Sequence, residues 1–203
     1  MTEHSTSPSQ QVEHGRHWHY LYKRRRRRAL GINARQMAWS QVVSLLGSVL
    51  AGVLLESNKA TLALVAGAFV VLPAVFDLDG TLGAVISAKI NHRLEDPRAK
   101  ALNVFASSVG FALVVASLAG LLVALVGASV AVLFFDAIFT QVFLLAFGAI
   151  VLSALLGFPF IGALSLFFRK LKVNPDDVVG PIESSIFDIL TVVTMVLVIG
   201  WLL

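Results

Sequence analysis

Long runs of hydrophobic residues alternate with short polar segments along most of the chain. Five runs are long enough to cross a membrane, whose hydrocarbon core of about 30 Å takes about 20 helical residues. We expect these spans at residues 36–55, 60–90 with an interruption, 102–126, 141–168 and 182–203. The runs are continuous, whereas the strands of membrane barrels alternate polar and apolar positions over about ten residues. The pattern therefore predicts an all-α membrane protein with five transmembrane helices.

The composition agrees with this class of protein. Hydrophobic residues make up 57% of the 203 positions and charged residues 14%, and the mean hydropathy is +0.84. A soluble domain carries about 25% charged residues. The absence of cysteine excludes thiolate metal sites, disulfides and cysteine nucleophiles. Because no glycine-rich phosphate loop or Ser/His/Asp arrangement is present either, we do not expect an enzyme.

Basic residues gather in segments that fall on one side of the predicted helices. They are Arg16, residues 23–28, Arg35, Lys89, Arg93, Arg98, Lys100, Arg169, Lys170 and Lys172. Short segments rich in lysine and arginine face the cytoplasm. Lys59 is the exception to this pattern. We therefore expect a multi-pass protein of the cell membrane with its N-terminus in the cytoplasm and its C-terminus outside.

The polar N-terminal segment differs in composition from the rest of the chain. Residues 1–35 are expected to form a disordered basic cytoplasmic tail, and residues 36–203 a five-helix transmembrane domain. Each basic residue near anionic lipid contributes on the order of 1 kcal/mol to membrane attraction. The arginine run is therefore interpreted as an anchor to the lipid bilayer, and no nucleic-acid partner is predicted.

Acidic residues inside the apolar runs are the strongest indication of function. Asp77 and Asp79 interrupt the second run, and Asp188 lies early in the fifth. An ionised carboxylate in hydrocarbon costs at least about 2.5–3.5 kcal/mol, so such residues normally face a bundle interior or a water-filled cavity on an ion path. The alternatives are that the first two meet headgroup water, and that Asp188 only pairs with a hydroxyl such as that of Thr191 or Ser153.

The segment around the first two aspartates predicts an irregular helix. Pro73, Gly80 and Gly83 surround them, and proline and glycine weaken the backbone hydrogen bonds of a helix. We therefore expect the second helix to break near residues 77–83. Counted from residue 60, Asp77 lies about 25 Å along this span, which puts it in the cytoplasmic half of the membrane together with Asp188.

The start of the last helix carries further polar candidates. Pro181 suits the first turn of a helix, where its missing N–H is no loss. Ser184 and Asp188 are four residues apart and share a face, and Asp177 joins that face if the helix reaches back so far. Glu183 is rotated by about 140° from Asp188 and is expected at the cytoplasmic mouth or against a neighbouring helix. The predicted metal-contacting residues are Asp188, Asp77, Asp79, Asp177, Ser184 and Glu183.

Two stretches resemble the transmembrane domain of the MgtE-type magnesium transporters and their eukaryotic solute-carrier relatives. One is Pro-Asp-Asp-Val-Val-x-Pro at residues 175–181, followed seven residues later by Asp188. The other is Pro73 with Asp77-x-Asp79-Gly80-x-x-Gly83 in the second span. The resemblance covers residues from about 36 to 203 of the sequence.

This resemblance implies five helices, an internal N-terminus and a pore between two such domains. It also implies that Asp188 is the pore aspartate that holds hydrated magnesium, and that Pro181 opens the same helix. Three local features depart from the bacterial pattern. The second helix lacks Gly-Asn-x-Gly and is closer to the half-length archaeal type, Lys89 stands where arginine is usual, and residues 174–177 read Asn-Pro-Asp-Asp instead of Asp-Pro-Asp-Asn. The regulatory cytoplasmic domains of bacterial relatives are expected to be missing from this transmembrane-only member.

Magnesium chemistry is consistent with such sparse acids. Mg²⁺ requires octahedral oxygen coordination and keeps several waters, so one or two carboxylates commonly hold it. A two-fold pair would place two copies of Asp188 around a shared axis. We therefore expect transport of Mg²⁺ by a homodimer or by a pair with a homologous five-helix chain, although Mn²⁺, Co²⁺ and Ca²⁺ satisfy the same chemistry. The alternatives are a proton- or sodium-coupled carrier of another cation, and a non-transporting scaffold that binds lipid.

Overall fold

A computed structural model describes residues 35, 37–96, 98–171, 173 and 175–203, without the side chains of Asp176 and Asp177. The predictions for the basic tail, residues 1–34, lie outside these residues. The described residues fall into two units, one that ends at Trp39 and one that extends from Ser40 to Leu203. In the second unit every regular element is a helix, which confirms the predicted all-α class.

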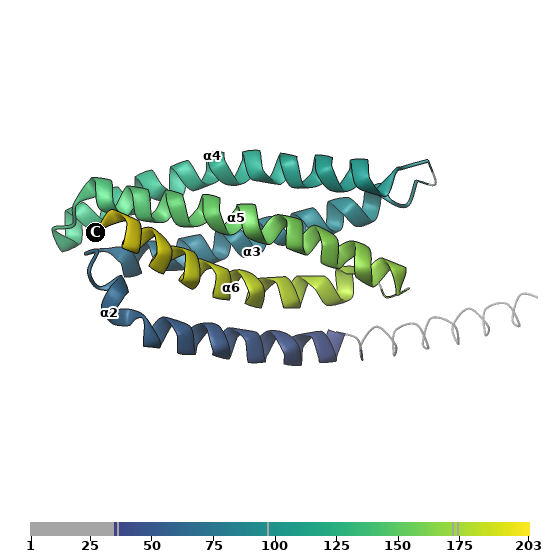
Figure 1. Cartoon of the computed structure of the whole chain (residues 1–203), viewed down its shortest axis with the longest axis horizontal. Coiled ribbons are helices and arrows are strands. Elements are labelled where there is room, and N and C mark those ends of the chain that lie inside the picture. Colours follow the sequence, from purple (N-terminus) through teal and green to yellow (C-terminus); the bar gives the residue numbers. More distant parts are fainter. Residues whose placement is uncertain (1–34, 36, 97, 172, 174) are drawn as a thin grey trace, which may run out of the picture. The chain divides into compact units, whose positions relative to one another are not determined.

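Five helices among the described residues are long and apolar enough to cross a membrane. They are the first helix (Met37–Ser57), α3 (Ala68–Arg93), α4 (Ala101–Phe135), α5 (Phe139–Lys170) and α6 (Pro175–Leu202). A short helix, α2 (Lys59–Leu62), follows the first. Figure 1 shows α3 to α6 packed side by side, and α3 contacts all three of the others. The number of spans confirms the prediction from hydrophobicity.

The interruption in the second span lies before α3, and our prediction of a break at residues 77–83 is wrong. α3 is continuous through this region and includes Pro73. The chain instead turns at Gly67, whose φ of +86° is in the left-handed region that favours glycine. Pro73 removes only one hydrogen bond near the start of the helix. The helix also has no need to open around Asp79, because hydroxyl groups of neighbouring helices bind this carboxylate.

The observed helix boundaries change the depth of the aspartates. Asp77 and Asp79 lie towards the middle of the 26-residue α3, and Asp188 near the middle of the 28-residue α6, whereas we expected Asp77 and Asp188 nearer to the cytoplasmic ends of their helices. α6 begins at Pro175, so our prediction that Pro181 lies in the first turn is also wrong. Both prolines suit a first turn, and the earlier one takes this position. The helix thereby includes Asp177, whose side chain is outside the described structure.

Two clusters of buried apolar side chains fill the bundle, one after the other along its helices. The boundary falls between Val75 and Leu82 in α3, between Ile150 and Ala154 in α5, and between Phe187 and Met195 in α6. A buried polar residue occupies each of these three intervals: Asp79, Ser153 and Thr191. The core is therefore divided by a thin polar layer near the middle of the helices.

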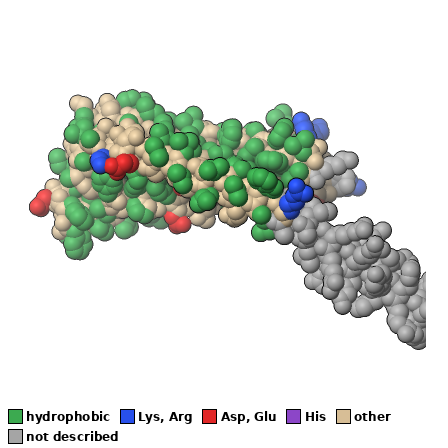
Figure 2. All heavy atoms as spheres, turned by 90° about the horizontal axis from the view of Figure 1, so that it is seen from below, with side chains coloured by type: hydrophobic (Ala, Val, Ile, Leu, Met, Phe, Trp, Pro, Cys, Tyr) green, Lys and Arg blue, Asp and Glu red, His purple; other side chains and the backbone are tan. Residues whose placement is uncertain are grey.

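Basic side chains gather at the end of the unit where α3 and α5 finish. The Arg169 guanidinium donates hydrogen bonds to the carbonyl oxygens of Asn91 (3.2 Å) and Leu94 (2.5 Å). Arg93 donates to the hydroxyl of Ser107 at 2.9 Å. Figure 2 shows a face that is mostly hydrophobic, with Lys and Arg side chains at the end beside the grey segment and a further basic side chain next to an acidic one towards the opposite end. The last carbonyls of a helix lack partners within it, so Arg169 fastens the end of α5 to the end of α3.

We predict that Arg169→Gln lowers stability by about 1–3 kcal/mol, because two helix-end carbonyls lose a charged donor. Lys170→Gln, at the exposed neighbouring position, is the control and should change little. The measurement is thermal unfolding of the purified protein in detergent. Equal melting temperatures for the two variants would show that Arg169 does not fasten these helices.

Candidate functional site

Asp188 lies on the side of α6 that faces the first helix. Ser48 of that helix donates a hydrogen bond to Asp188 Oδ2 at 3.1 Å. Asp188 is partly exposed and Ser48 is exposed, although both lie well inside candidate membrane spans. A carboxylate at this depth is therefore open to the surroundings of the five-helix unit, with one hydroxyl group as its partner among the described residues.

Small residues allow the first helix to approach α6 closely at this point. The Ser185 hydroxyl donates to the carbonyl oxygen of Ser44 at 2.7 Å. A Cβ added to Gly47 would lie 2.5 Å from Cβ of Ser185, so a larger residue would push the helices apart. Such small residues let membrane helices pack closely. The contact fixes Ser48 opposite Asp188.

The first helix contributes little to the core of the unit. Only 11% of its most apolar stretch is buried, against 28% to 50% for the other four spans. Its exposed apolar residues include Leu45, Leu46, Val49 and Leu50. The surface that carries Asp188 therefore lies beside a helix that is exposed along most of its length.

Asp79 has a different environment, inside the unit. Its side chain is 0% exposed. Its Oδ2 accepts hydrogen bonds from Ser153 of α5 at 2.5 Å and from Thr191 of α6 at 2.9 Å. The two hydroxyls that we weighed as packing partners of Asp188 thus belong to Asp79. The other carboxyl oxygen of Asp79, Oδ1, is buried without a hydrogen-bond partner among the described residues.

Glu183 is a second enclosed acid, with 1% of its surface exposed. A Cβ on Gly83 of α3 would lie 3.1 Å from its Cδ atom, so glycine makes room for this carboxyl group. Its Oε2 atom also lacks a partner within the described part of the chain. Of the two positions that we expected for Glu183, the structure supports contact with a neighbouring helix.

The other predicted site residues differ in their exposure. Asp77 and Ser184 are exposed on α3 and α6, and the side chain of Asp177 is not described. Within the described residues, no three Asp, Glu, His or Cys side chains lie close enough together to hold a metal ion. Among the predicted acids with described side chains, Asp79 and Glu183 are thus enclosed, Asp188 is partly exposed and Asp77 is exposed.

Ser48 was not predicted as a site residue, and Ser153 and Thr191 were considered only as alternative partners of Asp188, whereas they bind Asp79. These hydroxyls lie 140, 74 and 112 positions from the aspartates that they bind. Their only signal in the sequence is a polar residue within an apolar span. This signal indicates burial against other helices but does not identify the partner.

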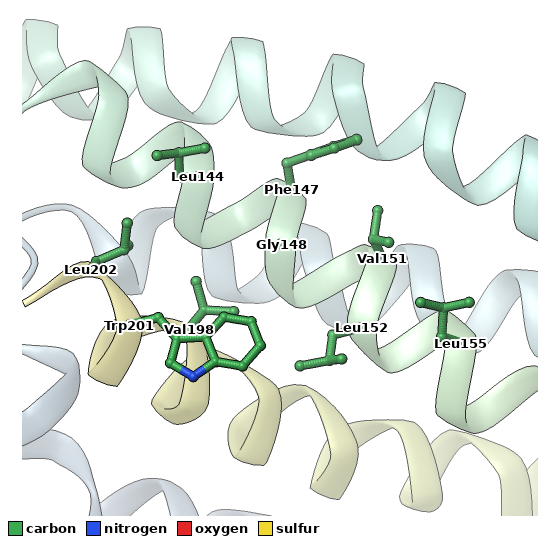
Figure 3. Close-up of a pocket in the computed structure, with 9 residues that line it drawn as sticks. All are labelled: Leu144, Phe147, Gly148, Val151, Leu152, Leu155, Val198, Trp201 and Leu202. Atoms are coloured by element: carbon green, nitrogen blue, oxygen red, sulfur yellow. The ribbon is translucent and has the colours of Figure 1, made fainter.

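A groove on the outside of the bundle lies between α5 and α6 and has a volume of about 360 Å³. Figure 3 shows its lining residues, which are Leu144, Phe147, Gly148, Val151, Leu152, Leu155, Val198, Trp201 and Leu202. None of these side chains carries a carboxylate, hydroxyl or amide oxygen, the groups that bind hard cations. The groove is therefore not part of the candidate cation site.

These features define a multi-pass helical membrane protein that keeps acidic side chains at the middle of its spans. The chain matches the family model of the MgtE divalent cation transporters over residues 72–198. Because this match covers more than half of the 203 residues, the chain belongs to the MgtE family of divalent cation transporters. No curated protein was found to match it. The family is one of transporters and not of enzymes, and it supports divalent cation transport across a membrane.

Proposed function

We propose that the protein transports Mg²⁺ through a pore between two copies of the five-helix unit, with Asp188 in contact with the ion. The observation that carries this proposal is the partly exposed carboxylate at the middle of α6. In hydrocarbon such a group is costly, so it requires water or a second protein surface. A second copy across a two-fold axis supplies both, because the two surfaces then enclose a hydrated path. A homologous five-helix chain would supply an equivalent surface.

The number and kind of ligands favour magnesium as the transported ion. Mg²⁺ sheds its waters reluctantly and is commonly held by one or two carboxylates with several waters retained. Two copies of Asp188 balance its charge, and Ser48 adds a hydroxyl beside each carboxylate. Asp77 and Ser184, which are also exposed, are proposed as further contacts along the same surface. Asp177 belongs to this group by its position in the helix.

The basic end of the unit supports an orientation in the membrane. Arg93, Arg169 and Lys170 lie where α3 and α5 end, and basic segments face the cytoplasm. We therefore propose that this end is cytoplasmic and that the C-terminus lies outside, in the cell membrane.

The proposed function is tested by ion flux into liposomes that contain only the purified protein. With a Mg²⁺-sensitive dye inside, an inward Mg²⁺ gradient should produce a signal well above that of protein-free liposomes. Parallel gradients of Mn²⁺, Co²⁺ and Ca²⁺ rank the ions. Flux equal to that of empty liposomes for every divalent ion would contradict transport by this chain.

Assembly gives a separate prediction. Because one unit encloses too few polar groups for a hydrated ion, we predict two chains per particle in mild detergent. The measurement is light scattering coupled to size-exclusion chromatography, corrected for bound detergent. A particle with one chain at all protein concentrations would exclude a homodimeric pore.

A further inference from the structure

The polar layer inside the unit has the features of a second cation site. Asp79, Ser153 and Thr191 come from three different helices and meet between the two apolar clusters of the core. All three side chains are 0% exposed. Asp188 instead binds a hydroxyl of the first helix. The layer is therefore separate from the surface proposed for magnesium.

The charge of Asp79 has no counterpart in this layer. Among the described residues of the second unit, α4 and α6 contain no basic residue, and those of α5 are Arg169 and Lys170 at its C-terminal end. The basic residues of α3 begin with Lys89, about 15 Å along the helix from Asp79. A carboxyl group in an apolar interior is either protonated or paired with a positive charge. A bound cation would provide it.

The side chains of the layer carry oxygen atoms whose lone pairs a cation can use. Oδ1 of Asp79 is buried without a partner, and Oδ2 is shared by both hydroxyls. Ser153 Oγ also lies 3.0 Å from the carbonyl oxygen of Ile150, but a hydroxyl has one hydrogen to donate. When Ser153 donates to Ile150, its lone pairs are free to join those of Asp79. Carboxylate and hydroxyl oxygens are the ligands that hard cations prefer.

The packing beside the layer leaves little room for the water shell of a cation. Phe187 fills the adjacent space so closely that a Cβ on Gly157 would lie 2.2 Å from its ring. Mg²⁺ keeps several waters and needs room for them. A single carboxylate in the layer matches a single positive charge. Glu183 of α6 is an enclosed acid outside the layer. Its carboxyl group lies beside Gly83, closer to the basic end of the unit than Asp79.

We propose that Asp79, Ser153 and Thr191 form a binding site for a dehydrated monovalent cation inside each five-helix unit, with Na⁺ as the probe. The cation neutralises Asp79 and connects α3, α5 and α6 at the middle of the bundle. The site stands independently of the magnesium pathway, because none of its three residues contacts Asp188 through the hydrogen bonds described above.

The test is thermal unfolding of the purified protein in NaCl and in choline chloride of equal ionic strength. A ligand that binds only the folded state raises the melting temperature, by about 5 °C or more when its concentration is a hundred times its dissociation constant. We expect this shift for the wild-type protein and for Asp188→Asn, and its loss in Asp79→Asn. Asp188→Asn removes the proposed magnesium contact but leaves Asp79, Ser153 and Thr191 unchanged. The Na⁺ shift is therefore expected even if the protein does not transport Mg²⁺.

A matched pair of variants covers the case in which Asp79→Asn does not fold. Ser153→Ala should reduce the Na⁺ shift, whereas Ser165→Ala should keep it. Ser165 is also in α5 and buried, and it donates to the Ser87 hydroxyl at 3.1 Å outside the proposed site. The same melting temperature in Na⁺ and in choline for the wild-type protein would overturn the proposal. An equal Na⁺ shift in both serine variants would overturn it as well.

Discussion

Asp188→Asn is expected to abolish most Mg²⁺ transport while the protein still inserts and pairs. The change preserves the size of the side chain and its ability to accept a hydrogen bond from Ser48, but it deletes the charge that faces the ion. Losing about 1.4 kcal/mol of ion stabilisation already slows passage tenfold. With two copies affected in a dimer, we expect a decrease of at least about tenfold.

The measurement is Mg²⁺ flux in liposomes with matched amounts of wild-type and variant protein. Glu56→Gln is the control, because Glu56 is an exposed acid that pairs with Lys59 near the end of the first helix. It should transport at the wild-type rate. If Asp188→Asn also transports at that rate, the assignment of Asp188 to the ion path is wrong.

Gly157→Ala is expected to produce a large loss of stability. Its new Cβ would lie 2.2 Å and 2.6 Å from two ring atoms of Phe187. That ring is fully buried, is bounded by Gly83 on α3 and makes an edge contact with Phe158, so it has no free space to move into. Overpacking of this kind costs about 1–3 kcal/mol. Because Phe187 precedes Asp188, its displacement should also reduce transport.

Thermal unfolding of the purified variants checks this prediction. Gly110→Ala in α4 is the control, because no atom beyond its chain neighbours and the adjacent helix backbone lies within 4 Å of its added Cβ, and alanine favours the helix. Combining Gly157→Ala with Phe187→Leu should restore part of the stability by shortening the clashing ring. An unchanged melting temperature for Gly157→Ala would mean that Phe187 is not tightly held.

The positions of the membrane helices could be predicted from hydrophobicity because the spacing of apolar residues reports directly on burial in lipid. The acidic residues within these helices could be identified because they interrupt the apolar runs. The break in the second span could not be placed, since Pro73, Gly80 and Gly83 are compatible with either a broken or a continuous helix. The continuous helix is explained by Asp79, because its hydrogen bonds to Ser153 and Thr191 satisfy the carboxylate without a break in α3.

The local sequence also could not predict at which residue α6 begins or which residue binds Asp188. Pro175 and Pro181 both satisfy the requirements of a first helical position, and the observed helix begins at the earlier one. The hydroxyl that binds Asp188 comes from Ser48 in the first helix. That pairing depends on how closely the helices approach at Gly47, which only the three-dimensional packing reveals.

Chemical cross-linking at position 188 tests most directly whether two copies face each other across the ion path. The chain contains no cysteine, so Asp188→Cys introduces a single thiol. Leu197→Cys is the control, because this residue is 47% exposed and lies about 180° around α6 from Asp188. With a short bifunctional thiol reagent in liposomes, we predict a covalent dimer for Asp188→Cys and single chains for Leu197→Cys. Single chains from Asp188→Cys, or equal amounts of dimer from both variants, would contradict a pore lined by Asp188 at the interface of two copies.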